Sequence, residues 1–104
     1  MNIQVTNEAV EWFKEEFNLS GEEEYIRFFA RYGGCGSVQS GFSLGISREI
    51  PSIVGARVKK EGITFFIEDK DIWYFKGLDL HVHFNEANEE IEFHYTEQNE
   101  QTNS

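Results

Sequence analysis

The fold is decided by one stretch of the sequence, Ile26-Arg-Phe-Phe-Ala-Arg-Tyr-Gly-Gly-Cys-Gly-Ser-Val-Gln-Ser-Gly-Phe-Ser-Leu-Gly-Ile-Ser47. Apolar residues alternate with other residues on both sides of a glycine-rich centre, which is typical of two strands joined by a loop. The first strand is predicted over Tyr25–Tyr32, and Phe29 interrupts its alternation. Its core face is predicted to carry Ile26, Phe28, Ala30 and Tyr32.

The second strand, predicted over Val38–Ile46, has two very different faces. One face carries Val38, Ser40, Phe42, Leu44 and Ile46, and the other carries Gln39, Gly41, Ser43 and Gly45. Glycine weakens a strand unless another group must approach its backbone closely. We therefore expect a second sheet, a helix or a partner subunit to lie against Gly41 and Gly45.

The remaining elements follow from helical or alternating apolar spacing and from turn residues. In chain order they are a helix over Asn7–Leu19 capped by Thr6, a connection over Ser47–Gly55 around Pro51, a hairpin of Ala56–Lys60 and Ile63–Ile67, a helical turn over Lys70–Phe75 capped by Asp69 and Asp71 and closed by Gly77, and a hairpin of Leu78–Phe84 and Ile91–Tyr95. Residues 1–96 are predicted to form a single domain. Residues 97–104 are predicted to be a disordered tail, because the chain has no apolar residue from Thr96 onward.

Composition limits the function classes. The chain has 104 residues, ten Phe, four Tyr and two Trp, which suffices for one domain with an aromatic core. Its formal charge of −10 argues against nucleic acid and anionic membranes as partners. No apolar run approaches the roughly 20 residues that span a bilayer, and the first residues lack the pattern of a signal peptide. A single cysteine cannot form an internal disulfide, so we expect a cytoplasmic protein.

The order of these elements resembles the HesB/IscA-like family, the A-type iron–sulfur carrier proteins and their relatives. The resemblance is most specific in three segments, namely Ile26–Ser47 with Gly34-Cys35-Gly36, Gly62-Ile-Thr-Phe-Phe-Ile-Glu-Asp69, and Asp71-Ile-Trp-Tyr-Phe-Lys-Gly77. The chain looks closest to the small YneR-type HesB-like proteins. The resemblance implies an α+β, mostly β domain of twisted, sandwich-like strands with one N-terminal helix and a short helical turn. It also allows a homodimer.

The resemblance implies that Cys35 is an iron or iron–sulfur cluster ligand. The carriers also have a Cys-Gly-Cys motif after their last strand, and this chain has no cysteine there. A cluster commonly binds four thiolates, and a symmetric dimer of this chain supplies two. The other ligands would then come from a protein partner, a second subunit or a small thiol. The cofactor, if there is one, is expected to be iron or an iron–sulfur cluster.

The residues around Cys35 allow other interpretations. Gly33, Gly34 and Gly36 let backbone N–H groups turn toward the sulfur and favour the thiolate, and Arg31 can add positive charge nearby. Cys35 is then a reactive thiol of a redox or sulfur-handling module. It can equally be a small buried hydrophobic residue, in which case the chain is an interaction domain that has lost metal binding. No catalytic triad order, nucleotide-binding glycine pattern or zinc-type cysteine spacing is present, so we do not expect an enzyme.

All three histidines are predicted to lie on one face of the last hairpin. His81 and His83 are two residues apart on one strand and therefore share a face, and His94 lies on the outward face of the partner strand. One register places His81 opposite His94, and a register shifted by two residues places His83 there. Opposite side chains lie close enough to share a metal ion. The alternatives are an ordinary polar strand face, which we favour, and a pH-sensitive patch.

Overall fold

A computed structural model describes residues 1–33 and 41–97 of the chain. The elements in these ranges are β1 (Ile3–Val5), α1 (Asn7–Glu16), β2 (Glu24–Tyr32), β3 (Phe42–Ser47), β4 (Val54–Lys60), β5 (Ile63–Glu68), the 3-10 helix η1 (Asp69–Phe75), β6 (Leu78–Asn85) and β7 (Glu90–Glu97). The predicted α+β class with mostly β structure is confirmed. In the described ranges, neither helix has the length and apolar character needed to cross a bilayer. The predicted tail beyond Glu97 lies outside these ranges.

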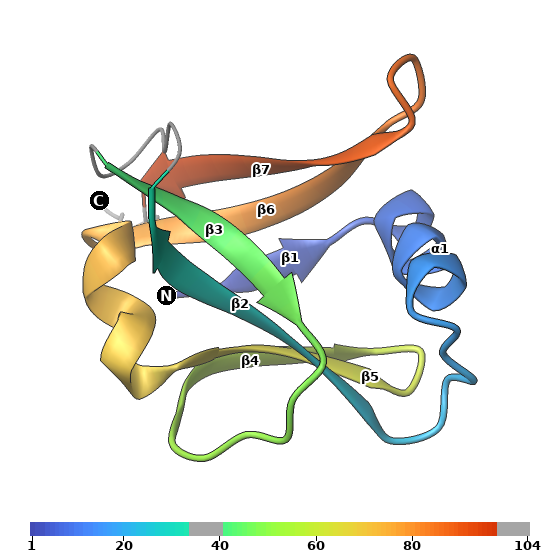
Figure 1. Ribbon diagram of the computed structural model, residues 1–104, viewed down its shortest axis with the longest axis horizontal. Helices are drawn as coiled ribbons and strands as arrows, with labels where there is room; N and C mark the ends of the chain where they lie inside the picture. Colours follow the sequence, from blue (N-terminus) through green and yellow to red (C-terminus); the bar gives the residue numbers. More distant parts are fainter. Residues whose placement is uncertain (34–40, 98–104) are drawn as a thin grey trace, which may run out of the picture.

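The strands form two sheets, one of order β1-β6-β7 and one of order β3-β2-β5-β4. Figure 1 shows α1 and the yellow-orange η1 at opposite ends of the molecule. Aromatic rings connect the two sheets and the helix α1. The ring of Phe28 in β2 lies 5.6 Å from that of Phe93 in β7, and the ring of Phe13 in α1 lies 5.1 Å from that of Phe65 in β5. The core therefore lies between the sheets and under α1.

The first helix begins where the sequence predicts. Thr6 is its N-cap, and the Thr6 hydroxyl accepts a hydrogen bond of 3.2 Å from the Ala9 N–H. The helix ends at Glu16 rather than at the predicted Leu19, because Phe17 is the C-cap and Asn18 takes a positive φ of 54°. The short strand β1 was not predicted. It pairs in parallel with β6, and its buried Ile3 and Val5 are the alternation that indicates it.

The register of the last hairpin is the first of the two that the sequence allowed. His81 lies opposite His94, Val82 opposite Phe93, and His83 opposite Glu92. The shifted register with His83 opposite His94 is therefore wrong. Strand β7 continues to Glu97, two residues beyond the predicted end at Tyr95.

Three predictions about the strands β2 and β3 need correction. Tyr32 was expected on the core face of β2, but it is 85% exposed because β2 extends past the core at this end. Gly45 has a close neighbour, but this is the ring of Phe29 from the adjacent strand rather than a second sheet or a helix. A contact with a partner subunit stays a prediction. At Gly41 an added Cβ atom would have no neighbour within 4 Å among the described residues, and the glycine instead takes a positive φ of 85°. Of the strand predicted over Val38–Ile46, residues 38–40 lie outside the described ranges.

The helical turn is present as η1, but its two aspartates do not cap it. The N-cap is Glu68, which makes no side-chain capping hydrogen bond. Asp71 is instead buried and forms an ion pair of 2.8 Å with Arg27 of β2. Leaving a buried carboxylate without a charged partner costs more free energy than leaving a helix end without a cap. The turn ends with Lys76 in the left-handed conformation, followed by Gly77 at a positive φ of 80°.

Candidate functional site

The connection between β3 and β4 is fixed to the body of the protein by Glu68 at the end of β5. The Glu68 carboxylate accepts hydrogen bonds from the backbone N–H groups of Ser52, at 2.7 Å, and Ile53, at 2.9 Å. These two N–H groups lower the pKa of the Glu68 carboxyl because they stabilise its charged form. The carbonyl of Ile53 in turn accepts from the N–H of Asp69 at 2.8 Å. The middle of the connection is therefore held in one conformation.

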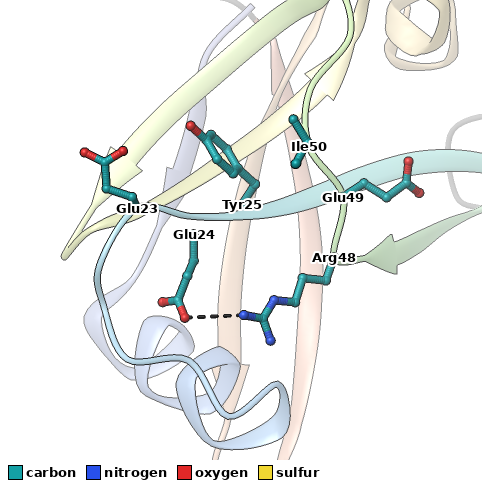
Figure 2. A pocket seen from close by; sticks show the side chains of 6 residues that line it. All are labelled: Glu23, Glu24, Tyr25, Arg48, Glu49 and Ile50. Atoms are coloured by element: carbon teal, nitrogen blue, oxygen red, sulfur yellow. Dashed lines mark hydrogen bonds and ion pairs between the residues drawn. The ribbon is translucent and has the colours of Figure 1, made fainter.

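Two ion pairs hold the beginning of the same connection. Figure 2 shows Arg48 and Glu24 pointing toward one another, and their charged atoms lie 3.5 Å apart. Arg48 also donates to the carbonyl of Phe17 at 3.2 Å. Glu49 lies 3.1 Å from Arg27. Arg48 and Glu49 are thus both paired with the body of the protein, although each side chain is about half exposed.

The apolar side chains of this connection face outward. Ile50 is 82% exposed and Ile53 is 68% exposed. We call these two residues the isoleucine ridge. A hollow of about 380 Å³ lies beside the ridge, and it is lined by Glu23, Glu24, Tyr25, Arg48, Glu49 and Ile50 (Figure 2). Exposed apolar side chains on a fixed backbone are suited to protein contacts, because little ordering is needed on binding.

The isoleucine ridge is not among the sequence predictions. Residues Ser47–Gly55 are predicted only as a connection around Pro51. The signal was available in Ile50-Pro51-Ser52-Ile53-Val54, because three large apolar residues in a connection are unusual unless they are buried or used for binding.

The predicted thiol site is only partly within the described residues. Cys35, Gly34 and Gly36 lie outside them. Of the predicted neighbours, Arg31 is exposed near the end of β2, opposite Ser43 of β3. Gly33 takes a positive φ of 105°, and its N–H donates to the carbonyl of Gly41 at 2.6 Å. The roles assigned to these residues stay predictions.

Aromatic side chains surround the end of β2 and the beginning of β3. The rings of Tyr32 and Phe42 meet edge to face with centroids 5.5 Å apart, and Phe42 meets Trp73 of η1 in the same way at 5.2 Å. Trp73 is 49% exposed. This cluster is a second apolar surface, separate in sequence from the isoleucine ridge.

The structure brings the histidines onto one face as predicted. The rings of His83 and His94 lie 4.7 Å apart, and those of His81 and His83 lie 6.4 Å apart. His81 already shares a hydrogen bond of 3.0 Å with Thr96, and His94 lies 3.1 Å from Glu92. Across residues 1–33 and 41–97, no group of three or more His, Cys, Asp or Glu side chains is placed to hold a metal ion. The metal role of the histidines stays a prediction.

The chain was compared with known protein families. The sequence profile of a family described as Iron-sulphur cluster biosynthesis matches residues 1–103. The chain belongs to this family. The match covers nearly the whole chain, which confirms the HesB/IscA-like resemblance that the glycine-rich segment indicated.

Relatives within the iron-sulphur cluster biosynthesis family are similar in length to this chain. A Bacillus subtilis (strain 168) protein named pyruvate dehydrogenase inhibitor is 45% identical over 95 residues, which are 91% of this chain and 99% of the relative. An uncharacterized protein of Staphylococcus aureus (strain MRSA252) is 35% identical over 98 residues, covering 92% and 98% of the two chains. An uncharacterized protein of Staphylococcus saprophyticus is 34% identical over 95 residues, covering 89% and 97%.

The residues of this chain do not by themselves fit the cluster that the family name implies. A cluster commonly binds four thiolates, and the sequence contains one cysteine. A second copy of the chain adds only one more. Any cluster bound here would therefore need ligands from another molecule.

Proposed function

We propose that this chain is a non-enzymatic accessory protein that acts by binding a protein partner, and that this partner is pyruvate dehydrogenase. The observation that carries the proposal is the Bacillus subtilis relative named pyruvate dehydrogenase inhibitor, which is 45% identical and aligned over 91% of this chain. Identity at this level over the whole domain favours a shared mode of action. An inhibitor needs only a binding surface, so the proposal does not require a cluster or a catalytic group.

The isoleucine ridge is the surface we propose for this contact. Ile50 and Ile53 project from a backbone that Glu68 and Arg27 hold in place. Burying the two side chains against a partner would remove apolar area from water, and each buried isoleucine contributes about 1.5–3 kcal/mol. Because the backbone is already fixed, little of this free energy is lost in ordering the chain.

The test measures pyruvate dehydrogenase activity at rising concentrations of the purified chain. Wild type is expected to inhibit the enzyme, and the variants Ile50→Asp and Ile53→Asp are expected to need about tenfold more protein for the same effect. Ala87→Asp, an exposed position in the turn between β6 and β7, introduces the same charge elsewhere and is the matched control. Wild type without any effect would contradict the proposed function. Full inhibition by both isoleucine variants would contradict only the proposed surface.

Iron or iron–sulfur cluster binding through Cys35 is the second candidate function, and the match to the family profile favours it. In this case Cys35 supplies one ligand, and a partner, a second subunit or a small thiol supplies the others. The test is iron analysis with a visible spectrum on protein isolated without oxygen, comparing wild type with Cys35→Ser. Iron that is present in wild type and lost in the variant would support this function. Absence of iron from both proteins would contradict it.

A further inference from the structure

A hollow on the outer face of the four-stranded sheet differs in charge from the rest of the protein. It has a volume of about 440 Å³ and is lined by Tyr25, Pro51, Val54, Arg57, Val58, Lys59 and Thr64. The lining contains two cations and no carboxylate. In the whole sequence, however, Asp and Glu outnumber Lys and Arg by 19 to 9. We call this hollow the basic pocket.

The strand register explains how the polar groups of the basic pocket come together. Lys59 of β4 lies opposite Thr64 of β5, and Thr64 lies opposite Tyr25 of β2. These three residues therefore form one row across three strands and share a face of the sheet. Arg57 lies two residues before Lys59 on β4 and so points to the same face. Four hydrogen-bond donors are thus gathered from three strands.

These four donors are not used elsewhere in the described part of the protein. Lys14, Arg27 and Arg48 are each paired with a carboxylate. Arg57 and Lys59 make no ion pair with any residue in the described ranges, and the hydroxyls of Thr64 and Tyr25 make no hydrogen bond there. Arg57 and Lys59 are exposed and carry the same charge on one face of β4. An anion bound between them would be attracted by both charges.

We propose that the basic pocket binds an oxyanion, either a carboxylate or a phosphate group. Arg57 and Lys59 neutralise its charge, and the hydroxyls of Thr64 and Tyr25 donate to its oxygens. Charge-assisted hydrogen bonds of this kind are about twice as strong as neutral ones. Pro51 and Val54 line the same hollow and provide contact for the carbon part of an organic acid. This inference does not depend on pyruvate dehydrogenase or on iron.

The test is a titration of isotope-labelled protein followed by amide NMR at low ionic strength, where charge effects are least screened. Inorganic phosphate and succinate are added in separate experiments, with sodium chloride at matched ionic strength as the blank. Saturable shifts are expected at residues 57–59 and at Thr64 and Tyr25 with phosphate, with succinate or with both. Shifts with phosphate alone would indicate a phosphate group as the ligand, and shifts with succinate alone would indicate a carboxylate. Shifts no larger than those in sodium chloride would overturn the proposal.

Two double variants separate a specific site from general charge. Arg57→Glu with Lys59→Glu is expected to weaken binding by about tenfold or more. Lys70→Glu with Lys76→Glu makes the same change in charge at two exposed cations outside the pocket, and binding is expected to change by less than about twofold. Equal losses in the two variants would overturn the proposal, because they would indicate a general effect of net charge.

A third variant tests the hydroxyls without altering charge. Thr64→Val with Tyr25→Phe is expected to weaken binding by about threefold to tenfold, while the far-ultraviolet circular dichroism stays unchanged. Unchanged binding in this variant together with unchanged binding in Arg57→Glu with Lys59→Glu would show that the ligand lies elsewhere and would overturn the assignment.

Discussion

Arg27 of β2 and Asp71 of η1, which are 44 residues apart in sequence, form an ion pair of 2.8 Å with side chains only 13% and 10% exposed. The same guanidinium lies 3.1 Å from Glu49 in the connection between β3 and β4. Its central carbon also lies 5.3 Å from the centre of the Phe29 ring. One cation therefore holds both η1 and the base of the isoleucine ridge against the outer face of the sheet.

Asp71→Ala should lower the free energy of unfolding by about 2 kcal/mol. Among the described residues, the change leaves the nearly buried Arg27 charge with the half-exposed Glu49 as its one remaining ion-pair partner, and a poorly compensated buried charge is costly. Glu49→Ala is the control, with an expected loss of less than about 1 kcal/mol because Glu49 is more exposed. Urea unfolding measures both values. Equal losses in the two variants would contradict a dominant role for Asp71.

Gly45→Ala should destabilise the protein by about 1–3 kcal/mol, because a Cβ atom at position 45 would lie 2.7 Å from Cε2 of Phe29. Phe29→Leu should remove most of this clash, so the double variant should be more stable than the sum of the two single effects predicts. A double-mutant cycle by thermal or urea unfolding measures the coupling. Additive effects would show that the Phe29 ring is not what requires glycine at position 45.

Glu68→Gln should lower the free energy of unfolding most near neutral pH. The folded-state pKa of Glu68 is lowered by the N–H groups of Ser52 and Ile53, so its charge stabilises the fold above its unfolded pKa of about 4.3. That contribution is lost as the pH falls through the lower folded-state pKa. The difference in unfolding free energy between wild type and Glu68→Gln should therefore be constant at pH 6–7 and shrink in acid. A difference that grows below about pH 4 would contradict this assignment.

Thr6→Ala should lower the free energy of unfolding by about 1 kcal/mol, because it removes the acceptor for the Ala9 N–H at the start of α1. Thr6→Ser keeps the hydroxyl and should lose much less. The two variants are compared by urea unfolding. Equal losses would indicate that the threonine methyl group, rather than the cap, provides the stability.

Local patterns predicted most of the fold. Alternation predicted β2 and both hairpins, and Thr6 followed by helical spacing predicted the start of α1. The pattern was insufficient where it was short, as in β1 with only Ile3 and Val5. It was also insufficient where a charged side chain is buried, as at Asp71, because a sequence does not show which distant cation will neutralise it.

The candidate sites were predictable to different degrees. The glycine-rich segment around Cys35 identified the family. The isoleucine ridge and the basic pocket were not identified, since each depends on which apolar or charged side chains remain uncovered after folding. Lys59, Thr64 and Tyr25 come from three strands, and their alignment depends on the parallel pairing of β2 with β5.

The sequence by itself determined the elements other than β1, their order, the family and the presence of one thiol, because spacing, turn residues and composition are properties of local stretches of chain. Only the tertiary structure decided the register of His81 with His94, the pairing of Arg27 with Asp71 and the exposure of Ile50 and Ile53. The hairpin register depends on how β6 and β7 pair, which the alternation of their residues left open. The ion pair and the exposed isoleucines depend on segments far apart in the chain, which meet only when the four-stranded sheet, η1 and the connection between β3 and β4 pack together.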